Sequence, residues 1–401
     1  MNSGVSRWLY RVSSLVIISV LVAGLALGDA RPVEAATITV DDDYTAATPG
    51  WGTTAFATIQ EAVNAAAAGD TVDVKAGTYI EQVTITKNLT LHSTENAVIQ
   101  AYDSMTQDCT SPQLPENRPI VCVSNSFVTI QGFTIDGVSK ALTNPRLMGI
   151  AFRNAGGVVQ NNTIQNIRFA TMSSLQEGVG IYLYNSDLTA RTINIIGNTI
   201  TGFNKNGITL TSHSSWDPVS FLIQGNTITG LGPNQTTVQN GIQIELPRGS
   251  GIITGNTISN IAYNNTANPN ALVANSILNL NTLSMATTDN TITGAQGGIF
   301  YFDAQGQISN NTISVVKPGL NAFGILASDP PWAVPSPYDS TYISGATSNN
   351  AFNGAALQAV LSIEVAGNTV AFPGTSKSST KGIAAEAGIG GLELDLNVHD
   401  N

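Results

Sequence analysis

The chain has 401 residues, a formal net charge of −11 and two cysteines, and only 11% of its residues are charged. This acidic balance argues against nucleic acid as a ligand, because phosphate neutralisation needs clusters of Lys and Arg. It also disfavours a polyuronate held by direct salt bridges, unless calcium mediates, so the composition fits a neutral glycan best.

The first residues have the pattern of a secretory signal peptide. Arg7 and Arg11 precede an apolar run at residues 15–27, and the small residues Val33 and Ala35 stand at −3 and −1 of a cleavage site. The run is short for a membrane span, and an uncleaved anchor is the alternative. We therefore expect residues 1–35 to be removed from a secreted, extracellular or periplasmic protein that has no membrane association after cleavage. Without these residues the net charge is −12.

A short amphipathic helix is expected next. Thr58 and Glu61 have capping-box spacing, and one apolar stripe follows: Ile59, Ala62, Val63 and Ala66. Such a helix can plug the end of a repeat array, whose first turn would otherwise expose strand edges and a bare core. Strands are expected after it at residues 71–74, 82–86, 89–92 and 98–101.

The two cysteines, Cys109 and Cys122, flank a Pro-rich loop at residues 110–119. In an exported protein this pair is expected to form one disulfide. Two free buried thiols remain the alternative. A metal site would need more ligands nearby than this spacing provides.

Two short motifs recur along the rest of the chain. Asn-Thr-Ile begins at Asn162, Asn198, Asn226, Asn256, Asn290 and Asn311, with a variant at Asn368. Gly-Ile begins at Gly149, Gly180, Gly207, Gly241, Gly298 and Gly324. Self-similarity at such spacings indicates a solenoid, and apolar–polar alternation within the repeats indicates strands.

Three strands per turn with Asn at a corner predict an all-β, right-handed parallel β-helix. Asn suits a corner because it tolerates the left-handed conformation, and stacked amides can hydrogen-bond from turn to turn. An antiparallel sandwich with chance repeats is the alternative.

These rungs resemble the parallel β-helix repeats of the pectin-lyase-like superfamily, and residues 56–93 resemble its amino-terminal cap and first rungs. The resemblance covers roughly residues 37–397 and implies the fold. It does not imply one activity, because that superfamily includes lyases, hydrolases, epimerases and non-catalytic surface proteins. We expect a single domain at residues 36–401, with a cap at 56–101, regular rungs at about 127–370 and a final rung or cap at 382–398.

Two insertions are expected to leave the solenoid from the same corner, at residues 212–220 and 329–350. Loops that leave equivalent corners can wall a groove along the helix axis. His213 and Trp216 lie on the first insertion and Trp332 on the second, which makes them candidates for substrate binding. A solvated loop histidine is the alternative for His213.

Aligning the Gly-Ile strands on their glycines predicts columns of outward side chains. Six members are candidate substrate-binding residues: Arg153, Tyr182, Tyr184, Thr211, Gln243 and Phe302. Aromatic faces stack on pyranose rings while polar neighbours bind hydroxyls, so this mixture suits a sugar-binding groove. Tyr and Phe are also ordinary strand formers, which is the alternative.

Three carboxylates are candidate catalytic groups: Glu245, Asp303 and Asp329. Rungs stack about 4.8 Å apart, which places Asp303 and Asp329 about one rung apart. Glu245 and Asp303 are then about two rungs apart if residues 275–281 form the intervening strand. Glycosidases use carboxylates about 5 Å apart for retention and about 6.5–9.5 Å apart for inversion. The two aspartates can instead hold calcium, or accept backbone hydrogen bonds in turns.

The leading hypothesis is a secreted glycoside hydrolase that cleaves a glycan along the groove, with Glu245 and Asp303 as acid and base. The alternative is a non-catalytic extracellular protein that binds glycan or acts as a spacer. A calcium-assisted polyuronate lyase is third, with Arg153, Tyr182, Tyr184 and Arg191 as candidates for the base and for neutralising the uronate. No cofactor or resident metal is expected apart from possible calcium. Oligomeric state is left open.

Overall fold

The computed structural model describes residues 35–111, 115–213, 218–263, 273–282, 284–302, 304, 306–315 and 323–328, and the strands at 361–366, 369–371, 381–386 and 394–399. The chain divides into two units, Met1–Ala36 and Thr37–Asn401, and all the sheets belong to the second. The predicted signal peptide therefore lies outside the described residues, except for its last position.

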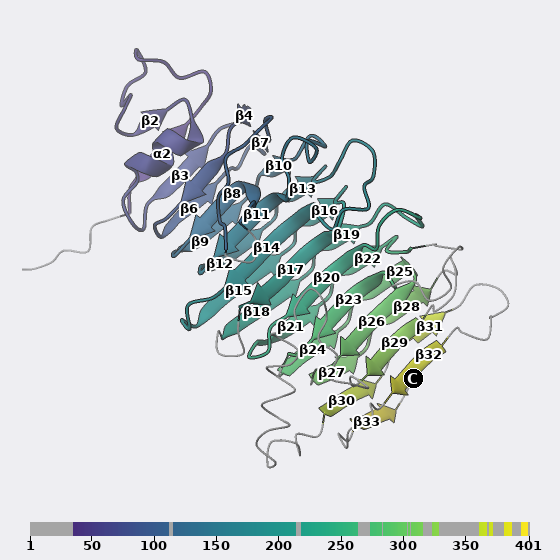
Figure 1. The fold of residues 1–401 in the computed structure, drawn as a ribbon. Coiled ribbons are helices and arrows are strands. Elements are labelled where there is room, and N and C mark those ends of the chain that lie inside the picture. The colour runs from purple at the N-terminus through teal and green to yellow at the C-terminus, as the bar shows by residue number, and fades with distance from the viewer. Residues whose placement is uncertain are drawn as a thin grey trace, which may run out of the picture. The chain divides into compact units, whose positions relative to one another are not determined.

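Three parallel sheets make up the second unit (Figure 1). Sheet A is ordered β2 (Ala55–Phe56), β1 (Thr37–Val40), β3 (Thr71–Val74), β6 (Leu89–His92), β9 (Phe127–Gln131), β12 (Gly156–Gln160), β15 (Arg191–Ile196), β18 (Val219–Gln224), β21 (Ser250–Thr254), β24 (Ser284–Thr288), β27 (Gly306–Ser309), β30 (Leu361–Ala366) and β33 (Leu394–His399). Sheet B contains β4 (Thr78–Ile80), β7 (Val98–Gln100), β10 (Thr134–Asp136), β13 (Thr163–Gln165), β16 (Thr199–Thr201), β19 (Thr227–Thr229), β22 (Thr257–Ser259), β25 (Thr291–Ala295), β28 (Thr312–Val315) and β31 (Thr369–Ala371). Sheet C contains β5 (Val83–Ile85), β8 (Arg118–Ser124), β11 (Leu147–Arg153), β14 (Val179–Asn185), β17 (Asn206–Ser212), β20 (Asn240–Glu245), β23 (Asn275–Leu280), β26 (Gly297–Phe302), β29 (Phe323–Ser328) and β32 (Lys381–Glu386).

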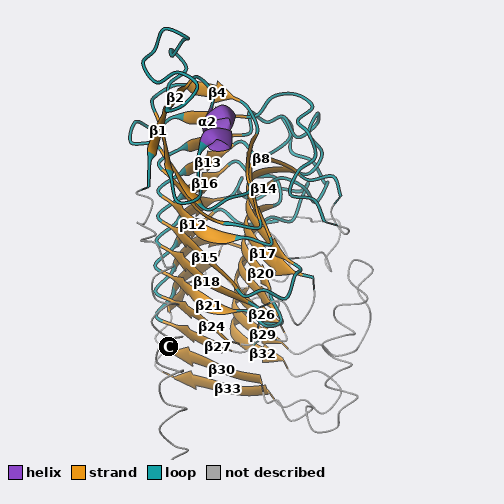
Figure 2. Cartoon of the chain, turned by 90° about the vertical axis from the view of Figure 1, so that its left-hand side faces the viewer, coloured by secondary structure: helices purple, strands orange, loops and turns teal. Residues whose placement is uncertain are grey.

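From β3 onward each strand pairs with the strand three places later in the chain, so every turn adds one strand to each sheet (Figure 2). All of these pairings are parallel, as in β15 with β18 and β17 with β20. This topology is a parallel β-helix, which confirms the predicted fold. Both predicted insertions follow strands of sheet C, β17 and β29, and therefore leave the same corner.

The predicted helix is present as α2 (Ile59–Ala65), and its apolar stripe is buried against the first strands. Thr58 is its N-cap, and the Thr58 hydroxyl accepts a hydrogen bond from the Glu61 backbone N at 3.3 Å. The Glu81 carboxylate also binds this end, accepting from the backbone N of Ile59 and Gln60 at 2.9 Å each. The Thr58 hydroxyl and the Glu81 carboxylate therefore satisfy three backbone donors that have no partner within the helix.

A ladder of six buried asparagines runs along the corner between sheets A and B: Asn162, Asn198, Asn226, Asn256, Asn290 and Asn311. The backbone N and the Nδ2 of each of the first five donate to the Oδ1 of the next, at 2.9–3.0 Å. Each Nδ2 also donates to a backbone oxygen at 2.8–3.0 Å, as in Asn226 to Ile195. The predicted amide stacking is therefore confirmed, and it satisfies polar groups that water does not reach.

The other expected reason for Asn at this corner is wrong for the ladder itself. The left-handed residue is the one before each ladder asparagine, with φ between 54° and 64°: Asn161, Gly197, Gly225, Gly255, Asp289 and Asn310. Gly, Asn and Asp tolerate this conformation, whereas the ladder position is selected for its buried amide. The residue before the ladder asparagine thus makes the left-handed turn, and the ladder asparagine provides the buried amide.

The Gly-Ile repeat has a packing cause. A Cβ added to Gly207 would lie 2.7 Å from the backbone oxygen of Gly241 in the next rung and 2.9 Å from Cγ2 of Ile228 in sheet B. Gly180 and Gly241 have the same surroundings, with the nearest backbone oxygen at 2.5 Å. The glycine therefore lets sheets B and C approach each other where their strands meet.

The core between the sheets is a stack of aliphatic columns. Sheet B contributes the Ile of each Asn-Thr-Ile motif, for example Ile200, Ile228 and Ile258, all at most 1% exposed. Burying each such side chain contributes roughly 1.5–3 kcal/mol.

Among the residues that the structure describes, no helix has both the length and the apolar character needed to span a membrane.

Replacing Asn226 with Ala should lower the free energy of unfolding by about 2–4 kcal/mol, because it leaves the buried Asn198 backbone N and the Ile195 oxygen without partners. Thr227→Ala, at the next and exposed position, should change it by less than about 0.5 kcal/mol. Denaturant unfolding of both variants measures the difference. Equal losses would show that the ladder is not a major source of stability.

Gly207→Ala should cost about 3 kcal/mol by overpacking. Gly225→Ala is the matched control, because nothing lies within 4 Å of an added Cβ there and φ is +64°. Gly225→Ala should therefore lower the free energy of unfolding only through the strain of the left-handed backbone, by about 1 kcal/mol. Thermal unfolding that ranks Gly225→Ala as the more damaging change would contradict the packing explanation.

Candidate functional site

The predicted columns on the outer face of sheet C are confirmed by strand register. Arg153 pairs with Tyr184, Tyr184 with Thr211, and Thr211 with Glu245. The column continues through Leu280 to Phe302, so β23 is the intervening strand that the sequence predicted. The second column contains Tyr182, Thr209, Gln243, Leu278 and Phe300.

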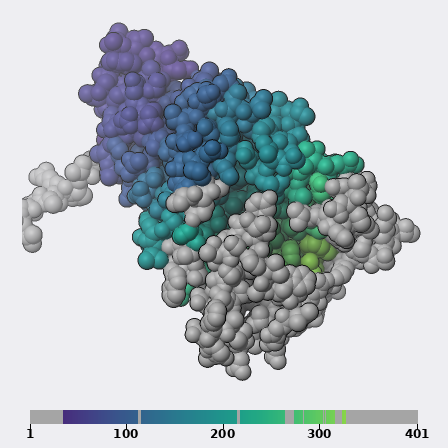
Figure 3. All heavy atoms as spheres, viewed as in Figure 1, coloured from purple at the N-terminus to yellow at the C-terminus, as the bar shows by residue number. Residues whose placement is uncertain are grey.

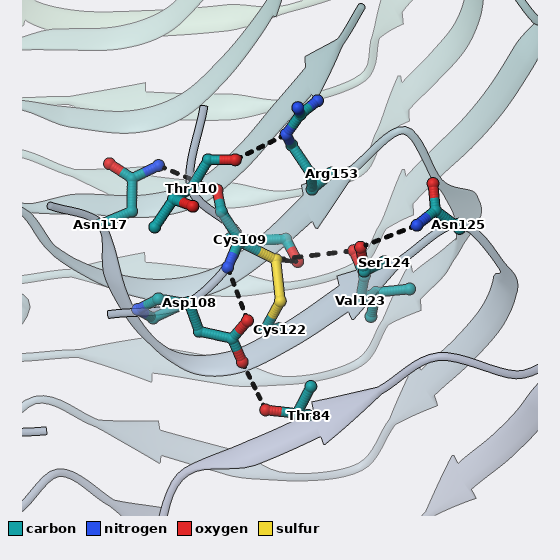
Figure 4. Close-up of a disulfide and its surroundings, with 12 residues drawn as sticks. Thr84, Asp108, Cys109, Thr110, Asn117, Cys122, Val123, Ser124, Asn125 and Arg153 are labelled. Atoms are coloured by element: carbon teal, nitrogen blue, oxygen red, sulfur yellow. Dashed lines mark hydrogen bonds between the residues drawn. A yellow bond between two sulfur atoms is a disulfide. The ribbon is translucent and has the colours of Figure 1, made fainter. Parts of the chain in front are cut away.

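The predicted disulfide is confirmed, with the Sγ atoms of Cys109 and Cys122 2.04 Å apart (Figure 4). It joins the loop between β7 and β8 to strand β8, on the outer face of sheet C. Within the loop, the Asn117 Nδ2 donates to the Cys109 oxygen at 3.2 Å, and the Asp108 carboxylate accepts from the Thr84 hydroxyl. The loop therefore forms a cover over the first rungs of sheet C.

A second, smaller hydrophobic cluster lies beneath this cover. Its members are Cys109, Cys122, Met148, Ala151, Val179, Tyr182 and Tyr184. Tyr182 and Tyr184 are each 5% exposed, so neither presents the open ring face expected of a sugar platform. Burial, followed by the charges of Tyr184 and Glu245, raises the pKa of Tyr182 well above its usual range.

Arg153 fixes the cover to the sheet. Its Nε donates to the Thr110 oxygen at 2.7 Å, its Nη1 donates to the Ser186 hydroxyl at 2.6 Å, and its guanidinium lies 5.3 Å from the Tyr184 ring centroid. A cation over an aromatic ring adds stability. These contacts give Arg153 a structural role, and its part in substrate binding stays a prediction.

Beyond β14 the outer face of sheet C changes character. Thr211, Gln243 and Glu245 are half-buried and point outward, while Ile242 and Ile244 point into the core. Next to them the face becomes apolar, with half-buried Leu278, Leu280, Phe300 and Phe302. Phe300 and Phe302 pack edge to face with centroids 5.9 Å apart. We call the outward side chains of β17, β20, β23 and β26 the sheet C face.

An amide cluster, which the sequence analysis missed, borders the sheet C face. The Gln243 Oε1 accepts from the Nδ2 atoms of Asn206 and Asn240 at 3.0 Å each, and the Asn240 Oδ1 accepts from the Asn275 backbone N at 3.1 Å. Within the described part of the chain, the Oδ1 atoms of Asn206 and Asn275 are buried without a hydrogen-bond partner. The sequence signal for this cluster was an Asn two residues before the buried Ile in three successive rungs: Asn206 and Asn240 precede Gly-Ile, and Asn275 precedes Ser-Ile.

Several predicted site residues cannot be placed relative to the sheet C face. Asp303, Asp329, Trp216 and Trp332 lie outside the described residues. His213 is exposed after β17, and its backbone N donates to the Asn185 oxygen at 2.8 Å. In the column that was predicted to contain both aspartates, Asn185, Ser212 and Leu246 are at most 5% exposed. The strand-exit position in those rungs turns into the corner, so it is not the open edge that was expected.

One cluster of potential metal ligands occurs among the described residues: Asp108, Cys109 and Cys122. Both sulfur atoms are bonded to each other, so neither can act as a thiolate ligand. This cluster does not fit a metal. Glu245 is the one acidic residue among the described strands β5 to β29 of sheet C.

No protein-family model matches the chain, and no curated protein matches its sequence. Solved structures that it resembles include the lacto-N-biosidase of family GH136 from Eubacterium ramulus, with TM-score 0.46, 11% identity, and coverage of 90% of this chain and 68% of that one. The family 28 exopolygalacturonase from Yersinia enterocolitica has TM-score 0.38, 10% identity, and coverage of 92% and 79%. A protein of Geobacillus virus E2 has TM-score 0.39 and 15% identity over 82% of this chain, which spans 56% of that protein's length. The three parallel sheets make this chain a parallel β-helix protein, as the resemblance predicted, and no residue role is transferred from these structures.

Lys205 lies at the corner that leads into β17 and is half-buried. Its Nζ donates to the Val238 backbone oxygen at 2.6 Å, and burial lowers its pKa from 10.5 to about 8. A folded-state pKa below the unfolded value means that the charged ammonium destabilises the fold. This penalty is fully present below about pH 8 and disappears as the pH rises towards 10.5.

Lys205→Met should therefore raise the free energy of unfolding at pH 7, by about 1–3 kcal/mol. The advantage over the wild type should shrink as the pH rises from about 8 to 10.5. Denaturant unfolding of both proteins at several pH values measures it. An advantage that does not depend on pH would mean that packing, and not the buried charge, causes it.

Proposed function

We propose that the protein is an exported carbohydrate-active protein that binds a neutral glycan across the sheet C face. The observation that supports this most directly is the position of Glu245. It follows Thr211 in one outward column, beside Gln243, and the next two rungs present Leu280 and Phe302. A carboxylate and hydrogen-bonding groups next to aromatic and aliphatic side chains suit a sugar, whose ring has apolar faces and polar edges.

Hydrolysis is the finer hypothesis, with Glu245 as acid or base. A second carboxylate would have to come from residues outside those described, and Asp303 and Asp329 are the candidates. Strands β20 and β26 are two rungs apart, a rise of about 10 Å. This is slightly more than the separation of about 6.5–9.5 Å used by inverting glycosidases. Hydrolysis with inversion would therefore require Asp303 to lean towards β23.

Non-catalytic glycan binding is the second candidate. The amide cluster around Gln243 supports it, because fixed neutral amides bind hydroxyl groups without providing an acid–base pair. A lyase has less support, since Arg153 already bonds to Thr110 and Ser186 and packs on Tyr184. The disulfide supports export, because such bonds persist in oxidising compartments.

The test is a screen of the protein against neutral and uronic glycans, with and without calcium, that measures new reducing ends and absorbance at about 235 nm. Hydrolysis should give reducing ends without the absorbance, and Glu245→Gln should abolish it. Glu116→Gln is the matched control, because that carboxylate is exposed on the covering loop. Retained activity in Glu245→Gln would refute the assignment of Glu245. Binding without cleavage would favour the second candidate, and an absorbance gain would identify a lyase.

A further inference from the structure

The outer face of sheet B differs from the other faces in its uniformity. Five successive strands, β16, β19, β22, β25 and β28, each present a hydroxyl side chain on both sides of a buried Ile: Thr199 and Thr201, Thr227 and Thr229, Thr257 and Ser259, Thr291 and Thr293, Thr312 and Ser314. Strand register joins them into two unbroken columns. All five members of the first column are exposed. We call these ten residues the threonine array.

Strand propensity alone does not account for this uniformity. The outer face of sheet A covers the same rungs with a mixed central column, Asn194, Leu222, Ile252, Ala286 and Gln307, and hydroxyl residues such as Thr192, Ser220, Ser250 and Ser284 form a column on one side of it. Both faces lie on β-strands and both reach solvent, so a preference for β-branched residues would act on each of them. The array therefore differs from sheet A in that its two hydroxyl columns are adjacent, with no mixed column between them.

The array is a rigid two-dimensional grid. Parallel strands stack about 4.8 Å apart, and alternate residues along a strand are about 6.6 Å apart. Each strand is held by its buried Ile, and the Asn ladder fixes the corner immediately before it. Thr is also stiff at χ1, so binding costs little side-chain entropy. The Ser259 hydroxyl donates to the Thr229 hydroxyl at 3.3 Å, which shows that the grid links neighbouring rungs.

The chemistry of the grid restricts its ligand. Each threonine presents one methyl and one hydroxyl group, and the ten positions include no charge and no aromatic ring. Ionic partners lack a counter-charge here, and sugar rings lack a stacking platform. A ligand that matches a flat, neutral, repeating grid must itself be neutral, rich in hydrogen bonds and periodic.

We propose that the threonine array binds ice. In a tetrahedral network of water molecules joined by O–H···O bonds of about 2.75 Å, second neighbours lie about 4.5 Å apart and the longer hexagonal repeat is about 7.3 Å. The protein grid agrees with both spacings to within roughly a tenth. Hydroxyl groups can occupy water positions in the lattice while the methyl groups between them exclude liquid water. This activity is independent of the sheet C face.

The test is partition of the full-length mature protein into slowly growing ice, together with inhibition of ice recrystallisation. The wild type should enter the ice, and Thr257→Lys, in the central strand of the array, should reduce the partition several-fold by holding the neighbouring rungs away from the lattice. Thr192→Lys is the matched control, an exposed strand position on sheet A. It should partition like the wild type, as should Glu245→Gln. Circular dichroism and melting curves verify that all variants fold.

Exclusion of the wild type from ice, at the level of an inert protein of similar size, would overturn the proposal. An equal loss in Thr192→Lys and Thr257→Lys would also overturn it, because the effect would not belong to the array. Retention on crystalline cellulose without entry into ice would assign the array to a solid polysaccharide instead and would likewise refute ice as the ligand.

Discussion

The buried asparagine ladder is the constraint on which the rest of the β-helix depends. Each Asn uses its amide to bond to the next rung and to the preceding strand of sheet A, so every turn of the chain bends at the same place. Because this corner is fixed, the short strands of sheet B begin in register, and their isoleucines stack in the core. The glycines at the start of the sheet C strands then let this third sheet pack closely against those isoleucines. Local bonding at one corner thus sets the alignment of all three faces.

Much of this fold could be predicted from the sequence because it repeats. The spacing of Asn-Thr-Ile gave the strands, the spacing of Gly-Ile gave the outward columns, and the Thr58–Glu61 pair gave the helix cap. The left-handed corner was placed one residue too late, although the signal was present: Gly precedes the ladder Asn at positions 197, 225 and 255. The sequence repeat locates the corner. The burial of both residues in the structure is needed to decide which one makes the left-handed turn and which one provides the buried amide.

The candidate site could be predicted only in part, because a loop that occurs once has no periodic signal. Register placed Thr211 and Glu245 side by side as expected. The sequence did not show that the loop between β7 and β8 covers the neighbouring rungs and buries Tyr182 and Tyr184. The disulfide was predicted from the two cysteines. Their positions in the sequence do not show which face of the β-helix the loop between them crosses. Aromatic residues on an outward column can therefore be core residues of a second, smaller cluster.

The contrast between two faces of the same solenoid follows from the kind of ligand that each can recognise. Sheet C varies from rung to rung, from Thr211 to Glu245 to Leu280 to Phe302, and only a ligand of finite length with different groups along it can use such a sequence. Sheet B repeats one hydroxyl pattern over five rungs, and a finite ligand would gain nothing from that repetition. Uniformity is useful when the ligand repeats at the spacing of the rungs. A β-helix can offer both kinds of surface because its corners fix the backbone independently of the side chains that face outward.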